Sequence, residues 1–87
     1  VIVVCGFPDL SEFWQQDCGA AAQNILLTAA DLGYGACWCG VHPTDRTEKV
    51  KAIIKRDSIP VMAITVGFAA ESPDARGRYE SGKVIEI

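Results

Sequence analysis

Most hydrophobic residues of this chain gather in short runs separated by glycine and polar residues. The β-branched run at 1–5 stops at Gly6, which is the pattern of a buried strand. Similar short apolar runs at 36–41 and 61–67 predict two more strands. Near the end, 84–87 alternates apolar and polar residues and predicts a short final strand.

One long stretch has a different, helical period. Across residues 14–32 the apolar side chains step by three and four, and between 18 and 32 there is one formal charge, Asp31. This predicts a long helix that is buried on more than one side. We expect either Asp9 or Ser11 to cap its start and Gly33 to end it in the left-handed conformation.

A second, shorter helix is predicted after His42 and Pro43. Asp45 and Glu48 match a capping box, and the helix has one narrow apolar face. Residues 68–83 predict an irregular tail. Taken alone, the order strand, helix, strand, helix, strand indicates a three-layer α/β sandwich with parallel strands.

The composition bounds the function. The 87 residues, 49% of them hydrophobic, allow a single domain over 1–87, with more apolar surface than so small a core needs. We therefore expect a missing segment or a second subunit. A net charge of −3 with no basic stripe excludes nucleic-acid binding, and no apolar stretch approaches the ~20 residues that cross a membrane. The start at Val1 indicates a piece of a longer chain or a processed product.

The four cysteines lie in apolar contexts, which favours free thiols and a cytoplasmic location. Cys37 and Cys39 with His42 form at most a fragment of a metal site, because zinc ligand pairs prefer wider spacing and no second pair is visible. We therefore predict no metal. The sequence also offers no acid–base pair or nucleophile with a partner, so we assign no catalytic side chain.

Two other motifs involve glycine. The glycine-rich segment 33–40 follows a helix and opens a strand, which is the reverse of a dinucleotide-binding fingerprint. Arg76 and Arg78, separated by Gly77, can point the same way and fork onto a phosphate, although spacing alone favours a solvated pair.

Taken together, these segments resemble a known family. Residues 13–30 are similar to the central helix of FMN-dependent nitroreductases, and the similarity continues over 32–43. It resumes at 60–71 and extends to Arg76 and Arg78. The resemblance covers nearly the whole chain, in the order of the family's C-terminal half.

The resemblance implies an α+β fold, the C-terminal portion of a three-layer α/β/α nitroreductase-like sandwich with a largely antiparallel sheet, which replaces the parallel pairing. It implies a homodimer that holds FMN at its interface. In such proteins the flavin performs the chemistry. NAD(P)H is the electron donor, and a small molecule such as a nitroaromatic or quinone is the acceptor.

Site residues follow by position. The resemblance places Trp38 and Cys39 against one flavin face and the backbone of Gly40 and Val41 near its reactive nitrogen. It assigns Arg76 and Arg78 to the FMN phosphate. It also places the long helix in the dimer core and the tail, 68–87, over the partner, where 84–87 adds a strand.

Some features depart from the family. Its N-terminal Arg-x-Ser-x-Arg phosphate motif is absent, and Gly67-Phe68-Ala69 stands where Gly-Tyr-Pro is usual. Without the missing N-terminal half, the chain is expected to bind FMN poorly. Two alternatives stay open: a non-catalytic dimerisation or assembly fragment, and a small metal or thiol-redox protein that uses Cys37, Cys39 and His42.

Overall fold

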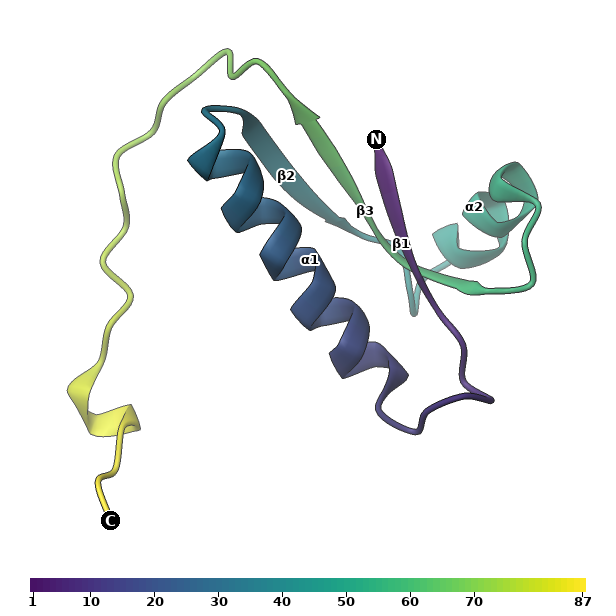
Figure 1. The fold of residues 1–87 in the computed structure, drawn as a ribbon, viewed down its shortest axis with the longest axis horizontal. Coiled ribbons are helices and arrows are strands. Elements are labelled where there is room, and N and C mark those ends of the chain that lie inside the picture. Colours follow the sequence, from purple (N-terminus) through teal and green to yellow (C-terminus); the bar gives the residue numbers. More distant parts are fainter.

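A computed structural model describes all residues from 1 to 87 as an α+β fold. In chain order its elements are β1 (Ile2–Gly6), α1 (Trp14–Asp31), β2 (Gly35–Gly40), α2 (Arg46–Ile54), β3 (Ile59–Gly67) and a one-turn 3-10 helix, η1 (Ser81–Lys83). The helix α1 lies along one side of the sheet, and α2 lies near the end where β2 stops and β3 starts (Figure 1). The first three predicted strands and both predicted helices are confirmed, with bounds shifted by at most two residues.

The sheet has the order β1-β3-β2, and both pairings are antiparallel. Ile64 of β3 pairs with Ile2 on one side and with Trp38 on the other. The parallel pairing predicted from element order is therefore wrong, and the antiparallel sheet implied by the resemblance is confirmed. Because β3 lies between them, β1 and β2 run in the same direction on either side of β3 and do not pair with each other.

The helix starts differ from the prediction. The N-cap of α1 is Phe13 and makes no side-chain cap bond, so neither Asp9 nor Ser11 caps the helix. Instead, the Ser11 hydroxyl accepts the Phe13 N–H at 3.1 Å and donates to the Asp17 carboxylate at 3.2 Å. A turn closed by Ser11 thus comes before the helix and delays its first residue to Trp14.

The capping box of α2 is not formed either, because the Asp45 carboxylate makes no cap bond and contacts Lys49 at 3.4 Å. The helix instead begins with the Thr44 hydroxyl, which accepts the Arg46 N–H at 3.1 Å. Gly33 fulfils its prediction. Its φ of +81° is left-handed, and the chain leaves α1 there.

The core is small and lies between α1 and the central strand. It consists of Cys18, Ala22, Val61, Met62 and Ile64. The opposite side of α1 is open to solvent, where Leu27 is 58% exposed. Burial of the helix on more than one side, as predicted, is therefore not met within this chain.

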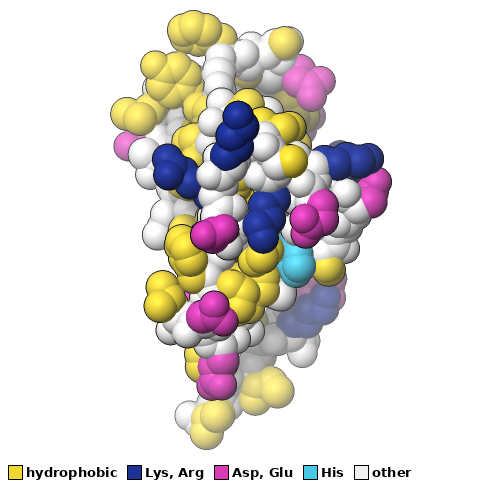
Figure 2. All heavy atoms as spheres, turned by 90° about the vertical axis from the view of Figure 1, so that its right-hand side faces the viewer, with side chains coloured by type: hydrophobic (Ala, Val, Ile, Leu, Met, Phe, Trp, Pro, Cys, Tyr) yellow, Lys and Arg dark blue, Asp and Glu magenta, His cyan; other side chains and the backbone are white.

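The molecule is larger than a compact domain of its size. Its accessible surface is 7121 Å² and its radius of gyration 15.5 Å. A compact monomer of 9.3 kDa has about 5,000 Å² of surface and a radius near 12 Å. Hydrophobic side chains on the surface are visible on the face seen in Figure 2.

The tail accounts for part of this excess. Every residue of 68–87 is exposed, and the segment leaves the end of β3 and runs past the α1 side without returning to the sheet (Figure 1). The irregular tail is thus confirmed. The strand predicted at 84–87 is absent, because no neighbouring strand is available here to bond its backbone.

Candidate functional site

The candidate flavin-contacting residues lie where β2 ends. Pairing with β3 fixes three of them, since Trp38 faces Ile64, Cys39 faces Ala63 and Gly40 faces Met62. Val41 follows at once; it is buried, and its N–H donates to the Val61 carbonyl at 3.0 Å. The strand therefore delivers all four residues as one continuous, fixed segment.

Trp38 and Cys39 are consecutive in β2, so their side chains leave opposite faces of the sheet. The Trp38 ring lies on the α1 side, where a Cβ on Gly19 would be 4.0 Å from it, and the residue is 42% exposed. Cys39 is exposed on the other side, together with Cys37. A planar ring on one face of this strand can therefore contact the side chain of only one of the two residues, Trp38 or Cys39. The other side chain lies behind the strand backbone.

Gly40 offers an open stretch of backbone. A Cβ added there would meet no atom within 4 Å, whereas a Cβ on Gly6 would come 2.5 Å from the Trp14 ring. Gly40 is also exposed. The space beside its backbone therefore fits the close approach of a planar group such as the isoalloxazine ring of FMN.

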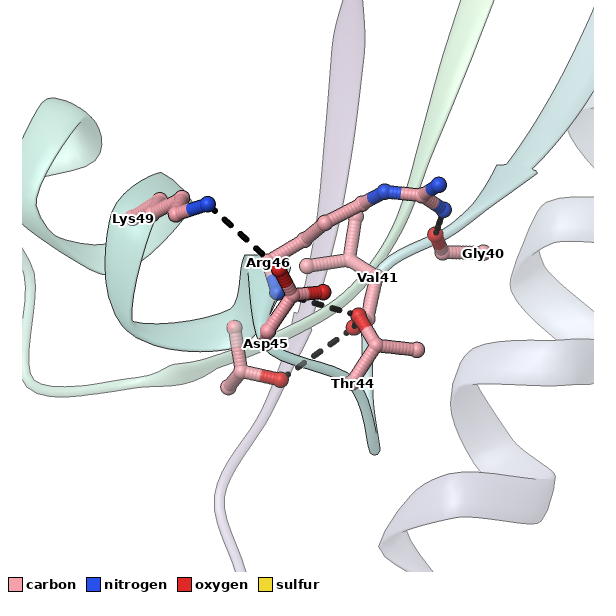
Figure 3. A network of polar contacts seen from close by, with 7 residues as sticks. Gly40, Val41, Thr44, Asp45, Arg46 and Lys49 are labelled. Carbon is pink, nitrogen blue, oxygen red and sulfur yellow. Dashed lines mark hydrogen bonds and ion pairs between the residues drawn. The ribbon is translucent and has the colours of Figure 1, made fainter.

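The loop after β2 holds this segment through a hydrogen-bond network (Figure 3). The Val41 carbonyl accepts from the hydroxyls of Thr44 and Thr47, the latter at 3.2 Å and buried. Arg46 Nη1 donates to the Gly40 carbonyl at 3.4 Å. Sequence analysis missed these three residues. A threonine directly before a predicted helix and another in its first turn are a signal that identifies Thr44 and Thr47, whereas nothing in the sequence marks Arg46.

Arg76 and Arg78, the candidate phosphate ligands, lie in the exposed tail. This single chain does not bring them to Gly40, because the tail extends away from the end of β2 (Figure 1). Neither guanidinium forms an ion pair, since the chain's salt bridges are Lys49–Asp45 and Lys83–Glu80. Both arginines are therefore free to bind an anion.

The residues of the metal alternative do not converge. No group of three or more His, Cys, Asp or Glu side chains is close enough to hold a metal ion. His42 packs its ring against Trp14 at a centroid distance of 5.4 Å, and its Nδ1 lies 3.4 Å from the Thr47 hydroxyl. His42 thus connects α1 to the loop after β2.

All four cysteines are free. Cys18 is buried in the core, and this burial raises the pKa of its thiol above the ordinary value, with smaller contributions from nearby Cys5 and Asp17. A raised pKa keeps the thiol protonated and unreactive at neutral pH. Cys18 therefore behaves as a core residue.

Three surface hollows lie away from the end of β2, one of them, of about 580 Å³, between the start of β2 and the segment that follows β3. A polar one of about 500 Å³ follows α2 and is lined by Lys51, Lys55, Arg56, Glu48 and Asp57. Dark blue and magenta side chains are mixed on this side of the molecule in Figure 2. An apolar hollow of about 420 Å³ lies between α1 and the sheet; Ile25, Leu32, Tyr34 and Val66 are among its lining residues. No helix of the structure is both long enough and apolar enough to cross a membrane.

Comparison with known proteins relates this arrangement to one family. The sequence profile described as "Nitroreductase family" matches residues 9–68. A relative from Methanothermobacter thermautotrophicus, named "Putative NADH dehydrogenase/NAD(P)H nitroreductase", is 40% identical over 89 residues, which cover 95% of this chain and 47% of the relative.

Solved structures agree. A Bacteroides thetaiotaomicron protein with the same name superposes with a TM-score of 0.89 at 36% identity, over 97% of this chain and 52% of the other. An FMN-dependent nitroreductase from Clostridium difficile R20291 superposes with a TM-score of 0.76 at 25% identity, over 88% of this chain and 50% of the other. The chain thus spans about half the length of the proteins it matches. The resemblance drawn from its helix and strand motifs is confirmed, and the chain belongs to the Nitroreductase family.

Proposed function

We propose that this chain is the C-terminal half of an FMN-dependent oxidoreductase domain that takes electrons from NAD(P)H and passes them to a nitroaromatic or quinone. The observation that carries the proposal is the open, rigidly held backbone at Gly40 and Val41, in a chain of the Nitroreductase family. When bound, FMN supplies the redox chemistry by accepting hydride equivalents from the nicotinamide.

The chain's own residues bind and orient the cofactor. Gly40 lets the ring approach the backbone, and Cys39 or Trp38 packs against the ring, depending on which face of β2 it occupies. Arg76 and Arg78 hold the phosphate with charge-assisted hydrogen bonds. Because the tail does not reach Gly40 of its own chain, we propose that these arginines serve a site completed by a partner chain.

The missing contacts are the second part of the proposal. The chain exposes about 2,000 Å² more than a compact protein of its mass, an area in the range that obligate interfaces bury. We propose that the complementary N-terminal half completes the three-layer sandwich. A second copy then covers the open side of α1 in a homodimer, with the tail, 68–87, over the partner and 84–87 added to its sheet. Four free thiols favour the cytoplasm as the location.

The alternative is an assembly fragment without flavin chemistry, which the exposed apolar side of α1 alone would support. The two are separated by titrating FMN into the chain, alone and together with the polypeptide that completes the fold, while flavin fluorescence and sedimentation are followed. If the chain is part of an oxidoreductase, flavin should bind, its yellow absorbance should be lost when NAD(P)H is added, and the absorbance should return when a quinone is added. An oligomer with no flavin affinity in either preparation supports the assembly fragment and overturns the enzyme.

A further inference from the structure

Arg46 lies beside the candidate flavin site, although neither the resemblance to the family nor the spacing of residues in the sequence identified it as a site residue. It is the first residue of α2, and its side chain reaches back along Val41 to the end of β2 (Figure 3). There Nη1 donates to the Gly40 carbonyl at 3.4 Å. A residue from the next helix thus contacts the same peptide that the ring would approach.

The backbone from which this side chain extends is held by hydrogen bonds. The Arg46 N–H donates to the Thr44 hydroxyl at 3.1 Å, and that hydroxyl also bonds the Val41 carbonyl. Thr47, the next residue of α2, holds the same carbonyl at 3.2 Å. The helix start and the strand end are therefore one hydrogen-bonded unit, and Arg46 extends from it.

Its charge is not neutralised by the protein. The two ion pairs of the chain involve Lys49 with Asp45 and Lys83 with Glu80, and neither includes Arg46. Of the five N–H donors of a guanidinium, one is used by Gly40. A positive charge with free donors therefore lies at the edge of the open Gly40 backbone.

We propose that Arg46 is a positioning residue that fixes the Gly40 peptide and places a positive charge beside bound FMN, favouring the reduced cofactor. This inference rests on the proposed function. A hydride carries two electrons and one proton, so its transfer oxidises NAD(P)H to NAD(P)⁺ and leaves the neutral isoalloxazine ring with one negative charge. A cation near the ring stabilises that state over the oxidised one.

The test compares three variants of the FMN-loaded protein. Arg46→Gln removes the charge and Arg46→Lys keeps it. Arg56→Gln is the matched control, because it removes one positive charge past the other end of α2, roughly 15 Å along the helix. The readouts are the dissociation constants of oxidised and reduced FMN and the midpoint potential, with the melting temperature as a check of folding.

We expect Arg46→Gln to reduce the preference for reduced over oxidised FMN about tenfold, which for a two-electron couple lowers the potential by ~30 mV. Arg46→Lys should retain most of the preference, and Arg56→Gln all of it. An unchanged potential in Arg46→Gln, or an equal shift in Arg56→Gln, overturns the role of Arg46 while the enzyme stands. A wild-type protein that binds no FMN even together with the polypeptide that completes its fold overturns both proposals.

Discussion

Gly6 and Trp14 are packed so closely that a Cβ on Gly6 would come within 2.5 Å of Trp14 Cε3 and 3.1 Å of the Cys18 sulfur. The contact joins the end of β1 to the first turn of α1. The Trp14 ring also packs against His42 in a tilted arrangement, so the same indole connects β1 to the loop after β2. This contact therefore fixes the orientation of the helix relative to the strand end that carries the candidate site.

The first prediction follows from this contact. Gly6→Ala should destabilise the fold by about 1–3 kcal/mol, because the indole or the strand must move to admit the methyl group. Urea unfolding of the protein measures the loss. Gly67→Ala is the matched control, since a Cβ there meets nothing within 4 Å. Equal stability of the two variants would contradict the close packing of Gly6 against Trp14.

A second prediction concerns the backbone alone. Gly33 has a φ of +81° and open space around it, so Gly33→Ala should cost about 1 kcal/mol from its own backbone alone, with no clash against other residues. Gly33→Asn should cost less, because asparagine tolerates the left-handed region. Thermal or urea unfolding should show that stability decreases from the wild type to Gly33→Asn and then to Gly33→Ala. A stabilising alanine would mean that the chain leaves α1 with another conformation.

The positions of the main elements could be predicted from local sequence, whereas their partners could not. The run at 61–67 marks β3 because its β-branched residues suit a buried strand. Nothing in that run says that it lies between β1 and β2, since sheet order depends on which edges meet after collapse. The segment 84–87 shows the same limit, because its alternating pattern fits a strand but only a neighbouring edge can make it one.

The candidate site also has parts that could be predicted from local sequence and parts that could not. Gly40 and Val41 could be placed at a strand end from sequence, because the apolar run stops there. The hydrogen bonds from Arg46 and Thr47 to this strand end could not be predicted from sequence. They depend on how the loop folds back, and at the start of a helix such side chains can also bond to the helix backbone instead. The distance between Arg76 and the strand end likewise depends on where the exposed tail lies, which the local sequence does not determine.

The raised pKa of Cys18 leads to a prediction on pH. Because burial raises the pKa of this thiol above its ordinary 9.0, the folded state binds its proton more tightly than the unfolded state. Its stabilising contribution is thus complete below pH 9 and is lost as the pH rises toward the folded pKa. Urea unfolding at pH 7.5 and pH 10 should show a smaller alkaline loss in Cys18→Ala than in the wild type. Cys37→Ala, at an exposed thiol, should keep the wild-type loss. If Cys18→Ala and Cys37→Ala lost the same stability between pH 7.5 and pH 10, Cys18 would not be a source of the alkaline loss.

Gly40 allows stability and cofactor binding to be separated. Its Cβ position is open and its φ is not left-handed, so Gly40→Ala should change the unfolding free energy by less than about 0.5 kcal/mol. The same methyl group would occupy the space proposed for the ring and should weaken FMN binding about tenfold, or ~1.4 kcal/mol. Fluorescence titration of FMN into the completed protein measures this, with Gly67→Ala as the control. Unchanged affinity would move the ring away from Gly40.

The two tail arginines provide the sharpest test of the proposed cofactor site. If Arg76 and Arg78 hold the FMN phosphate, replacing both with alanine should weaken binding by about 3–6 kcal/mol, since each hydrogen bond to a charged group contributes ~1.5–3 kcal/mol. Lys83→Ala is the control, because it removes one cation of the same exposed tail that is already paired with Glu80. Riboflavin, which lacks the phosphate, should bind the double variant and the wild type alike, so that a loss confined to FMN assigns both arginines to the phosphate. A double variant that binds FMN as tightly as Lys83→Ala would make Arg76 and Arg78 solvated tail residues, and the phosphate would need ligands from elsewhere.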